Sequence, residues 1–219
     1  MIVAIDGPAG VGKSTVARLL ASRLKFLYLD TGALYRAVAL AVLQSGLDPT
    51  EADAVAELLH KLSIEMDFNN DAVAVRLNGN DVTGELRTPA VSSAASVVSA
   101  IPAVRAWLLP IQRQIGQRGS VVAEGRDIGT KVFPAAEVKF FLEADATVRA
   151  ERRHRELVAA GHSRAIEQTE TEMAGRDNRD RSRAVAPLVA AEDALHIDTS
   201  RLSVAQVVDR MMAAVAAKL

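Results

Sequence analysis

The feature that most constrains this chain is a glycine-rich stretch at residues 7–14, which reads G-P-A-G-V-G-K-S and fits the pattern G-x-x-x-x-G-K-[ST]. It follows a short apolar run at residues 2–6 and precedes an amphipathic stretch at residues 14–24. In that context backbone N–H groups turn inward around phosphate oxygens, and the dipole of the following helix favours an anion. The stretch therefore predicts a buried strand, a phosphate-binding loop and a helix, in preference to a glycine-rich turn with an incidental lysine.

Four further apolar runs have the length and composition of buried parallel strands. They lie at residues 26–30, 121–125, 138–142 and 194–198. Helical patterns separate them, and the last one spans residues 204–219 behind a capping box formed by Ser203 and Gln206. Strands that alternate with helices predict an α/β fold with a five-stranded parallel sheet flanked by helices on both faces.

About ninety residues separate the second and third expected strands, far more than one strand-helix-strand crossover needs. Within this insertion, apolar and polar residues alternate at 64–68 and again at 73–77. Turn-forming residues at 69–71 and 78–79 follow these two stretches. We therefore expect a small antiparallel sheet in addition to the parallel one.

The same insertion contains signals for helix starts and stops. A capping pattern with proline at the first helical position predicts a helix from Pro49, and further helices are expected to begin at Pro89 and near Pro102. Pro110 falls inside the last of these and should kink or end it, because proline lacks a backbone N–H and clashes with the preceding turn. A second, shorter insertion at residues 161–184 is polar and rich in arginine.

Composition excludes several classes of protein. The 219 residues are 49% hydrophobic with a formal net charge of -1, which fits one globular unit without the basic surface of a general nucleic-acid binder. The absence of cysteine excludes disulfides, and the four scattered histidines argue against a transition-metal centre. With no basic leader and no long apolar stretch, we expect neither a signal peptide nor a membrane span, and hence a cytoplasmic protein.

The end of the glycine-rich loop has the chemistry needed to bind ATP with Mg²⁺. Lys13 is expected to neutralise the β- and γ-phosphates, and the Ser14 hydroxyl to bind the metal. The third strand ends in Glu124, which we interpret as a second magnesium ligand, direct or through water, like the acid of a Walker B element. A carboxylate at a strand end can equally be a helix cap or a solvated charge, and that alternative stays open.

Residues 176–183 contain four arginines, a run that by itself fits a solvated helix face or a nucleic-acid patch. A phosphoryl-transfer site, however, must hold several negative charges close together, and guanidinium groups do this with paired hydrogen bonds. Arg36 and Arg126 follow the second and third strands, and ligands of open α/β sheets bind beyond the carboxyl ends of strands. We therefore predict that arginines hold an anionic acceptor there.

Several sequence blocks occurring in order carry a family resemblance. They are D-G-P at residues 6–8, D-T-G-A-L-Y-R at 30–36, G-R-D-I-G-T at 125–130, V-F-P at 132–134, the arginine run, and A-P-L at 186–188. On these blocks the chain resembles bacterial cytidylate kinases, in the nucleoside monophosphate kinase group, along essentially its whole length. The loop alone is shared by many enzymes, whereas the joint occurrence of the other blocks is specific.

The resemblance implies an enzyme that transfers the γ-phosphoryl group of ATP to CMP, and to dCMP, with Mg²⁺ as the accompanying metal. It implies a monomer built as a single P-loop kinase unit, residues 1–219. Within that unit, residues 33–115 would form a monophosphate-binding insertion and residues 158–185 a lid. No nucleic acid or membrane is expected as a partner.

The resemblance also implies roles for individual residues. The nucleotide would contact Gly7, Pro8, Ala9, Gly10, Val11, Gly12, Lys13, Ser14 and Thr15. The acceptor phosphate would contact Arg36, Arg126 and Arg183, with Thr31 close by, the ribose Arg176 and Asp180, and the base Ser96, Arg105 and Asp127. Catalysis would depend on Lys13, Arg126, Arg176 and Arg183. In this sequence Thr31 stands where a serine is common in the family, and Glu124 where an aspartate is frequent.

The expected base contacts are chemically sensible for cytosine. Its N4 amino group is a donor beside the acceptors N3 and O2, so a carboxylate, an arginine and a hydroxyl together can recognise it. Uracil presents the acceptor O4 instead, and a carboxylate there would face a lone pair.

Two alternatives remain on the sequence alone. A P-loop kinase for another small molecule would share the fold, although the supply of arginines favours an anionic acceptor. A GTP-dependent switch would be expected to carry an N-K-x-D motif, which is absent from the sequence. The one match to the D-x-x-G motif, at residues 81–84, follows a turn instead of a buried strand.

Overall fold

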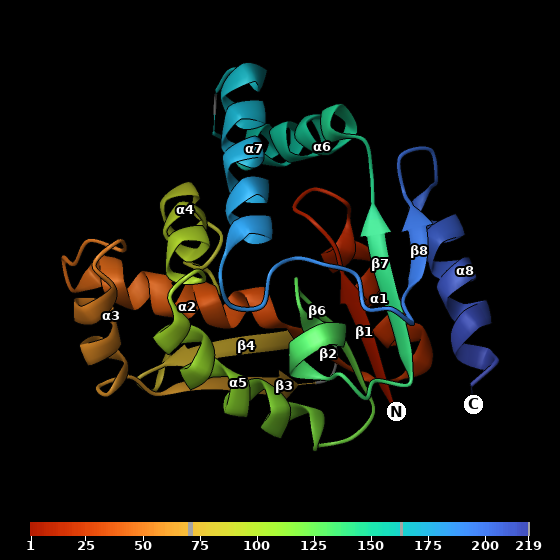
Figure 1. Cartoon of the computed structure of the whole chain (residues 1–219), viewed down its shortest axis with the longest axis horizontal. Helices are drawn as coiled ribbons and strands as arrows, with labels where there is room; N and C mark the ends of the chain where they lie inside the picture. Colours follow the sequence, from red (N-terminus) through yellow and green to blue (C-terminus); the bar gives the residue numbers. More distant parts are fainter. Residues whose placement is uncertain (70–71, 163, 219) are drawn as a thin grey trace.

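The computed structural model describes residues 1–69, 72–162 and 164–218. Its larger sheet contains five parallel strands in the order β2-β6-β1-β7-β8 (Figure 1). The strands are β1 Ile2–Asp6, β2 Leu27–Asp30, β6 Val121–Glu124, β7 Val138–Glu143 and β8 Leu195–Asp198. All five predicted strands are thus confirmed to within one residue at each end, since each is a short apolar run that the sheet buries.

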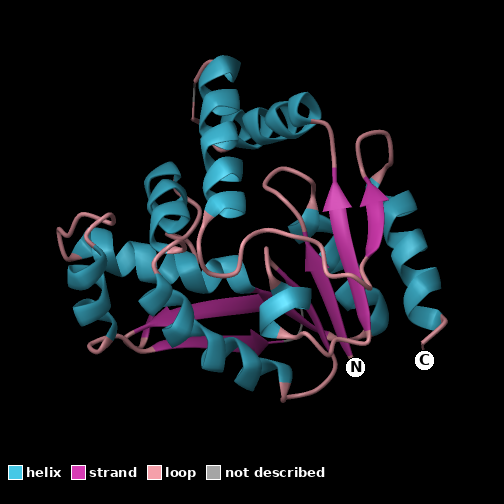
Figure 2. Ribbon diagram, viewed as in Figure 1, coloured by secondary structure: helices cyan, strands magenta, loops and turns pink. Residues whose placement is uncertain are grey.

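Helices cover both faces of this sheet (Figure 2). Successive side chains of a strand point to opposite faces, so Val3 and Ile5 of β1 join one buried cluster while Ala4 joins the other. The first cluster includes residues of α1 and α8, and the second includes residues of α2. These helices are α1 Lys13–Leu24, α2 Thr31–Gln44 and α8 Val204–Ala216, and Ser203 and Gln206 form the predicted capping box.

The smaller sheet lies in the long insertion and confirms the predicted antiparallel arrangement. It consists of β3 Ile64–Asn69, β4 Ala72–Leu77 and β5 Asn80–Asp81, in that order. Asn78 and Gly79 connect β4 to β5 with φ angles of 51° and 83°, the pair of positive values that a two-residue type I′ hairpin requires. Of the turn predicted at residues 69–71, residues 70 and 71 lie outside the described residues.

Two predictions for the helices of the insertion need correction. The first helix, α3 Ala52–Leu59, does not begin at Pro49, because Asp48 binds the backbone N–H of Thr50 at 2.8 Å and its hydroxyl at 2.7 Å in a separate local turn. Of the two outcomes predicted at Pro110, a kink or an end, the end is wrong, since the helix α5 Pro102–Gly116 continues through it, and the kink stays a prediction. Burial of Leu108 and Ile115 on its inner face outweighs the backbone hydrogen bond that proline removes.

The remaining helices gather at the carboxyl end of the parallel sheet. Thr88 caps α4 with its side chain, as the sequence predicts. Figure 1 shows α6 and α7 beyond the tip of β7, with α7 reaching towards α4, and α7 contacts both α6 and α4. These elements are α4 Pro89–Val98, the short π-helix η1 Ile128–Val132, α6 Ala146–Ala159 and α7 Ile166–Ser182.

Among the residues that the structure describes, no single helix is long and apolar enough to cross a membrane. The helices α4 and α5 reach that length and composition only as a pair, which bends by 101°. Apolar residues of this pair, including Val98, Val104 and Leu108, are fully buried in the core of the fold.

Candidate active site

A cavity of about 450 Å³ lies where the glycine-rich loop faces α2, α4 and α7. Most of the residues predicted for the site line it. From the loop these are Ala9, Gly10, Gly12, Lys13, Ser14 and Thr15, and from the remaining chain Thr31, Arg36, Ser96, Arg105, Glu124, Arg126, Asp127, Arg176, Asp180 and Arg183. The predicted residues Gly7, Pro8 and Val11 are buried and do not line the cavity.

Two glycines of the loop are required for different structural reasons, Gly7 for close packing and Gly12 for its backbone conformation. At Gly7 a side-chain carbon would collide with the backbone carbonyl of Leu142, so glycine lets β1 leave the sheet beside β7. Gly12 has φ 90° in the left-handed region and directly precedes α1, where it turns the first N–H groups of that helix towards the cavity. The loop is therefore a ready-made set of backbone donors at a helix N-terminus.

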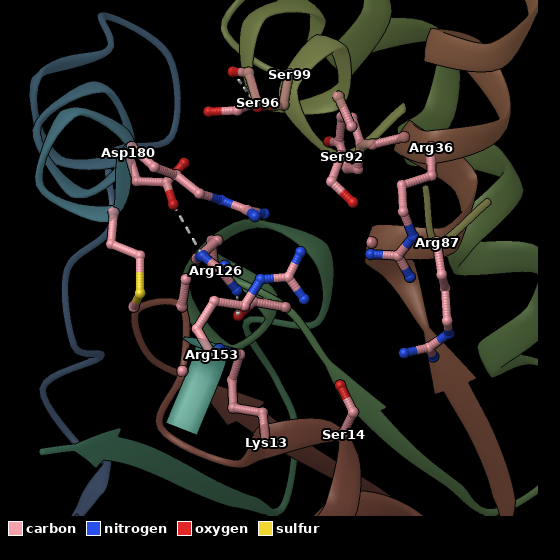
Figure 3. A pocket seen from close by; sticks show the side chains of 18 of the residues that line it. Lys13, Ser14, Arg36, Arg87, Ser92, Ser96, Ser99, Arg126, Arg153 and Asp180 are labelled. Atoms are coloured by element: carbon pink, nitrogen blue, oxygen red, sulfur yellow. Dashed lines mark hydrogen bonds and ion pairs between the residues drawn. The ribbon is translucent and has the colours of Figure 1, made fainter. Parts of the chain in front are cut away.

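Lys13 is buried at the base of the cavity, and its Nζ donates to the backbone carbonyl of Pro8 at 2.6 Å. Burial lowers the pKa of this ammonium well below its ordinary value, and the nearby Arg126 lowers it further. An arriving phosphate would supply the negative charge that this environment lacks. In Figure 3, Lys13 and Ser14 lie together on one side of the cavity, facing the arginines.

Glu124 ends β6 and accepts a hydrogen bond from the hydroxyl of Tyr28, and the nearby hydroxyl of Ser14 favours its charged form. Burial raises the pKa of this carboxyl group, with a further contribution from Asp30 on the neighbouring strand. The described residues hold no group of three or more His, Cys, Asp or Glu side chains that could bind a metal by itself. A hydroxyl and one carboxylate nevertheless fit magnesium, which usually takes one or two protein ligands and completes its shell with phosphates and water.

Carboxylates hold two of the arginines that face the cavity. Arg36 pairs with Asp30 at 2.7 Å, and Arg126 pairs with Asp180 of α7 at 2.9 Å. Arg87, which sequence reasoning missed, approaches Asp30 at 3.5 Å and keeps 64% of its side chain exposed. Figure 3 shows Arg36 and Arg87 on one side of the cavity and Arg126 facing them.

A buried cluster of opposite charges occupies the far end of the cavity. One oxygen of Asp127 pairs with Arg105 and the other with Arg183 at 3.4 Å. Arg105 also donates to the carbonyl of Ser99 at 3.1 Å, and its guanidinium lies 5.5 Å from the ring centre of Tyr35. Arg105 and Asp127, both expected to face the base, are thus paired with each other, although Pro110 lies in the same helix as Arg105.

The helix α7 contributes groups from the opposite wall. Burial, reinforced by Arg126, lowers the pKa of Arg176 to about 10, and its Nε has no hydrogen-bond partner among the described residues. Burial alone would raise the pKa of Asp180, but Arg126 and Arg176 bring it below its ordinary value. This buried guanidinium N–H is left to donate to a ligand or water oxygen, as is Nε of Arg36.

Two further contacts differ from what sequence patterns indicate. Thr31 lines the cavity, but its hydroxyl donates to the backbone carbonyl of Glu124 at 2.7 Å and is thus already engaged within the protein. Ser96 accepts a hydrogen bond from Nε of Arg179 at 3.1 Å. Sequence reasoning predicted Ser96 for the site but missed Arg179. Arg179 belongs to the arginine run, yet nothing in the local pattern indicates which of its members face the cavity.

The helix α4 presents hydroxyls along one face, which the sequence could have revealed. Ser92, Ser96 and Ser99 are spaced three or four residues apart and all line the cavity. A polar stripe on a helix whose other face is buried is the available signal for such a wall.

Comparisons with known proteins agree with this geometry. A family model described as cytidylate kinase matches residues 3–217. Curated relatives named cytidylate kinase include one from Carboxydothermus hydrogenoformans, 48% identical over 212 residues that cover 97% of this chain and 96% of the relative. Another, from Mycobacterium leprae, is 48% identical over 213 residues that cover 97% of this chain and 94% of the relative. A solved gluconokinase from Sinorhizobium meliloti 1021, with a TM-score of 0.50 at 16% identity over 98% of this chain and 90% of that one, shares the fold alone.

Proposed function

Because this chain belongs to the cytidylate kinase family, and is an ATP-dependent kinase of CMP, we propose that it carries out the transfer in the cavity described above, between the glycine-rich loop and the arginines. The observation that supports this most directly is that two walls with different phosphate-binding groups face each other across the cavity. Backbone donors and Lys13 form one wall, and the guanidinium groups of Arg36 and Arg126 form the other.

On the nucleotide side, we propose that residues 7–15 hold ATP. Backbone N–H groups of the loop would cradle the phosphates, and Lys13 would move from the Pro8 carbonyl to the β- and γ-phosphates. Ser14 and Glu124 would hold Mg²⁺, which, when bound, neutralises charge on the phosphates. Tyr28, through its hydroxyl, would keep the Glu124 carboxylate oriented.

On the acceptor side, Arg36, Arg126 and Arg183 would bind the CMP phosphate, exchanging part of their present carboxylate bonds for phosphate oxygens. The free Nε of Arg176 and the carboxylate of Asp180 would contact the ribose. Because these contacts do not single out the 2′ position, dCMP would serve as a second acceptor.

The base would lie against the buried cluster. Asp127 would accept from the cytosine N4 amino group, because a carboxylate oxygen can accept a further hydrogen bond while it is paired with an arginine. Arg105 and Ser96 would meet the cytosine acceptors N3 and O2.

No covalent nucleophile is needed for the reaction. The acceptor phosphate oxygen is already anionic and attacks in line, so the protein contributes position and charge stabilisation. We propose that residues 33–115 form the monophosphate-binding insertion and residues 158–185 a lid, which closes to exclude water as a competing acceptor. We propose that the enzyme is a monomer, because all of these groups come from one chain. We also propose that it works in the cytoplasm, where ATP and CMP would meet.

A coupled assay of ADP release across CMP, dCMP, UMP, AMP and GMP tests the proposal. We expect the highest kcat/KM for CMP, with dCMP next and UMP clearly below both. Comparable turnover of all five acceptors would contradict the proposed base contacts, and ATP turnover that needs no acceptor would contradict the proposed lid.

A further inference from the structure

Asp6 is a buried acid that does not line the cavity and whose side chain bonds to no backbone group of the glycine-rich loop. It ends β1 and is only 4% exposed. One carboxylate oxygen accepts the backbone N–H of Ile128 and the other that of Gly129, each at 2.8 Å. A side chain of β1 thus binds a segment more than a hundred residues further along the chain.

The two backbone N–H groups that Asp6 binds lie at the start of a turn with unusual geometry. They begin the π-helix η1, directly after Asp127, and the N–H groups of Lys131 and Val132 return to the Asp127 carbonyl at 2.9 and 3.1 Å. π-helical turns are rare and are frequently found at functional sites. The backbone of Asp127 is therefore anchored on its carboxyl side by Asp6 and by its own helical turn.

A carboxylate suits this position better than any neutral side chain of the same size. Both oxygens must accept, whereas an asparagine has only one acceptor atom and would turn its NH₂ group against the second N–H. Burial raises the pKa of Asp6 to about 6, partly offset by the two backbone hydrogen bonds, so the group is ionised at neutral pH. Glycine at 129 leaves room, since a side-chain carbon there would lie 3.4 Å from Asp6 Oδ2 and 3.1 Å from Cδ of Lys139.

The position of Asp6 in the chain gives these bonds a consequence for function. It directly precedes Gly7, the first residue of the nucleotide-binding loop, while the turn it holds carries Arg126 and Asp127 at the acceptor side. We propose that Asp6 is a positioning residue that fixes Arg126 and Asp127 in register with the loop, and so sets acceptor affinity and base selection. This inference rests on the proposed function, in which Arg126 binds the acceptor phosphate and Asp127 the base.

Asp6→Asn tests the proposal. By losing one of two buried hydrogen bonds to a charged acceptor, it should weaken CMP binding about tenfold and narrow the CMP-to-UMP ratio of kcat/KM severalfold. ATP binding should change by less than about twofold, because the loop's own backbone supplies those donors. Titration calorimetry with each nucleotide alone separates the two affinities.

Lys139→Met is the matched control. Lys139 is also buried beside Gly129, but its Nζ binds the Pro134 carbonyl at 2.7 Å and Asp193 at 2.9 Å, and not the turn. We expect it to lower the melting temperature while leaving CMP affinity and the CMP-to-UMP ratio unchanged.

Equal effects of Asp6→Asn and Lys139→Met on CMP affinity would overturn the proposal in favour of general destabilisation, as would a parallel loss of ATP and CMP affinity in Asp6→Asn. Should Asp6→Asn fail to fold, Asp6→Glu keeps both acceptor oxygens but lengthens the side chain, and it should weaken CMP binding but not ATP binding. A wild-type enzyme without preference for CMP over UMP would contradict the proposed base contact of Asp127, while the split between CMP and ATP affinities would still decide the role of Asp6.

Discussion

The two sides of the cavity that we propose for the nucleotide and the acceptor offer phosphate different chemical groups. On the nucleotide side the donors are backbone N–H groups and one lysine, all within residues 7–15 of a single loop and helix start. On the acceptor side they are guanidinium groups carried by α2, α7 and the segment after β6. The carboxylates that hold these arginines come from still other positions in the chain.

This difference determines how each side responds to a ligand. Backbone donors fixed by glycines need little rearrangement, so the loop is ready for phosphate as it stands. The arginines are neutralised by Asp30, Asp127 and Asp180, and their hydrogen bonds must be partly exchanged when an acceptor arrives. We therefore expect substitutions in the loop to slow phosphoryl transfer to every acceptor. Substitutions on the arginine side should change the kinetics with the acceptor while leaving ATP affinity nearly constant.

The largest effect is expected for Lys13→Ala. Removing the one buried cation of the loop should lower kcat by about 10²–10³-fold with little change in melting temperature, because the charge acts on the transferring phosphoryl group. Steady-state kinetics and thermal melting check this, with the exposed Lys61→Ala as control. Retained turnover in Lys13→Ala with an unchanged melting curve would contradict the role of the loop in catalysis.

A smaller effect is expected for Arg183→Ala. This arginine bonds the Ala186 carbonyl at 2.6 Å and faces both Asp127 and Asp180, so it completes the acceptor side from the end of α7. Its loss should lower kcat by about 10–100-fold while ATP affinity stays nearly constant. The exposed Arg181→Ala on the same helix is the matched control, and weakened ATP binding with normal kcat at saturation would assign Arg183 to the nucleotide side instead.

A third prediction concerns the phosphate that all acceptors share. Arg36→Ala should raise KM for CMP and for UMP alike, by about tenfold, because it removes one charge-assisted contact common to both. Initial-rate measurements with the two acceptors at saturating ATP give the two factors. Unequal factors would mean that Arg36 also senses the base.

The same contrast explains what could be predicted from sequence. The loop and the strands are local patterns, so residues 2–24 were predicted nearly to the residue. The acceptor side depends on pairs far apart in the chain, such as Arg126 with Asp180 and Arg179 with Ser96, and no local pattern reports which arginine meets which carboxylate. The family resemblance indicated residues most of which line the cavity, but not the partners with which they pair.

The errors in the fold have the same origin in competing interactions. At Asp48 the carboxylate binds the backbone N–H of Thr50 in a local turn, so the helix predicted from Pro49 begins only at Ala52. Packing of α5 against the core carried that helix through Pro110. In each case an interaction that the linear pattern does not record decided the outcome.

The most direct test of the account is the ratio of kcat/KM for CMP to that for UMP in Asp127→Ala, compared with the same ratio in Arg36→Ala. In the wild type, UMP should be disfavoured by about 2–4 kcal/mol, because it leaves a buried carboxylate facing a lone pair. Asp127→Ala should lower activity on CMP and bring the two acceptors close together, whereas Arg36→Ala should leave their ratio as in the wild type. Equal loss of CMP and UMP activity in Asp127→Ala would contradict base reading, and would show that the carboxylate serves only to hold Arg105 and Arg183.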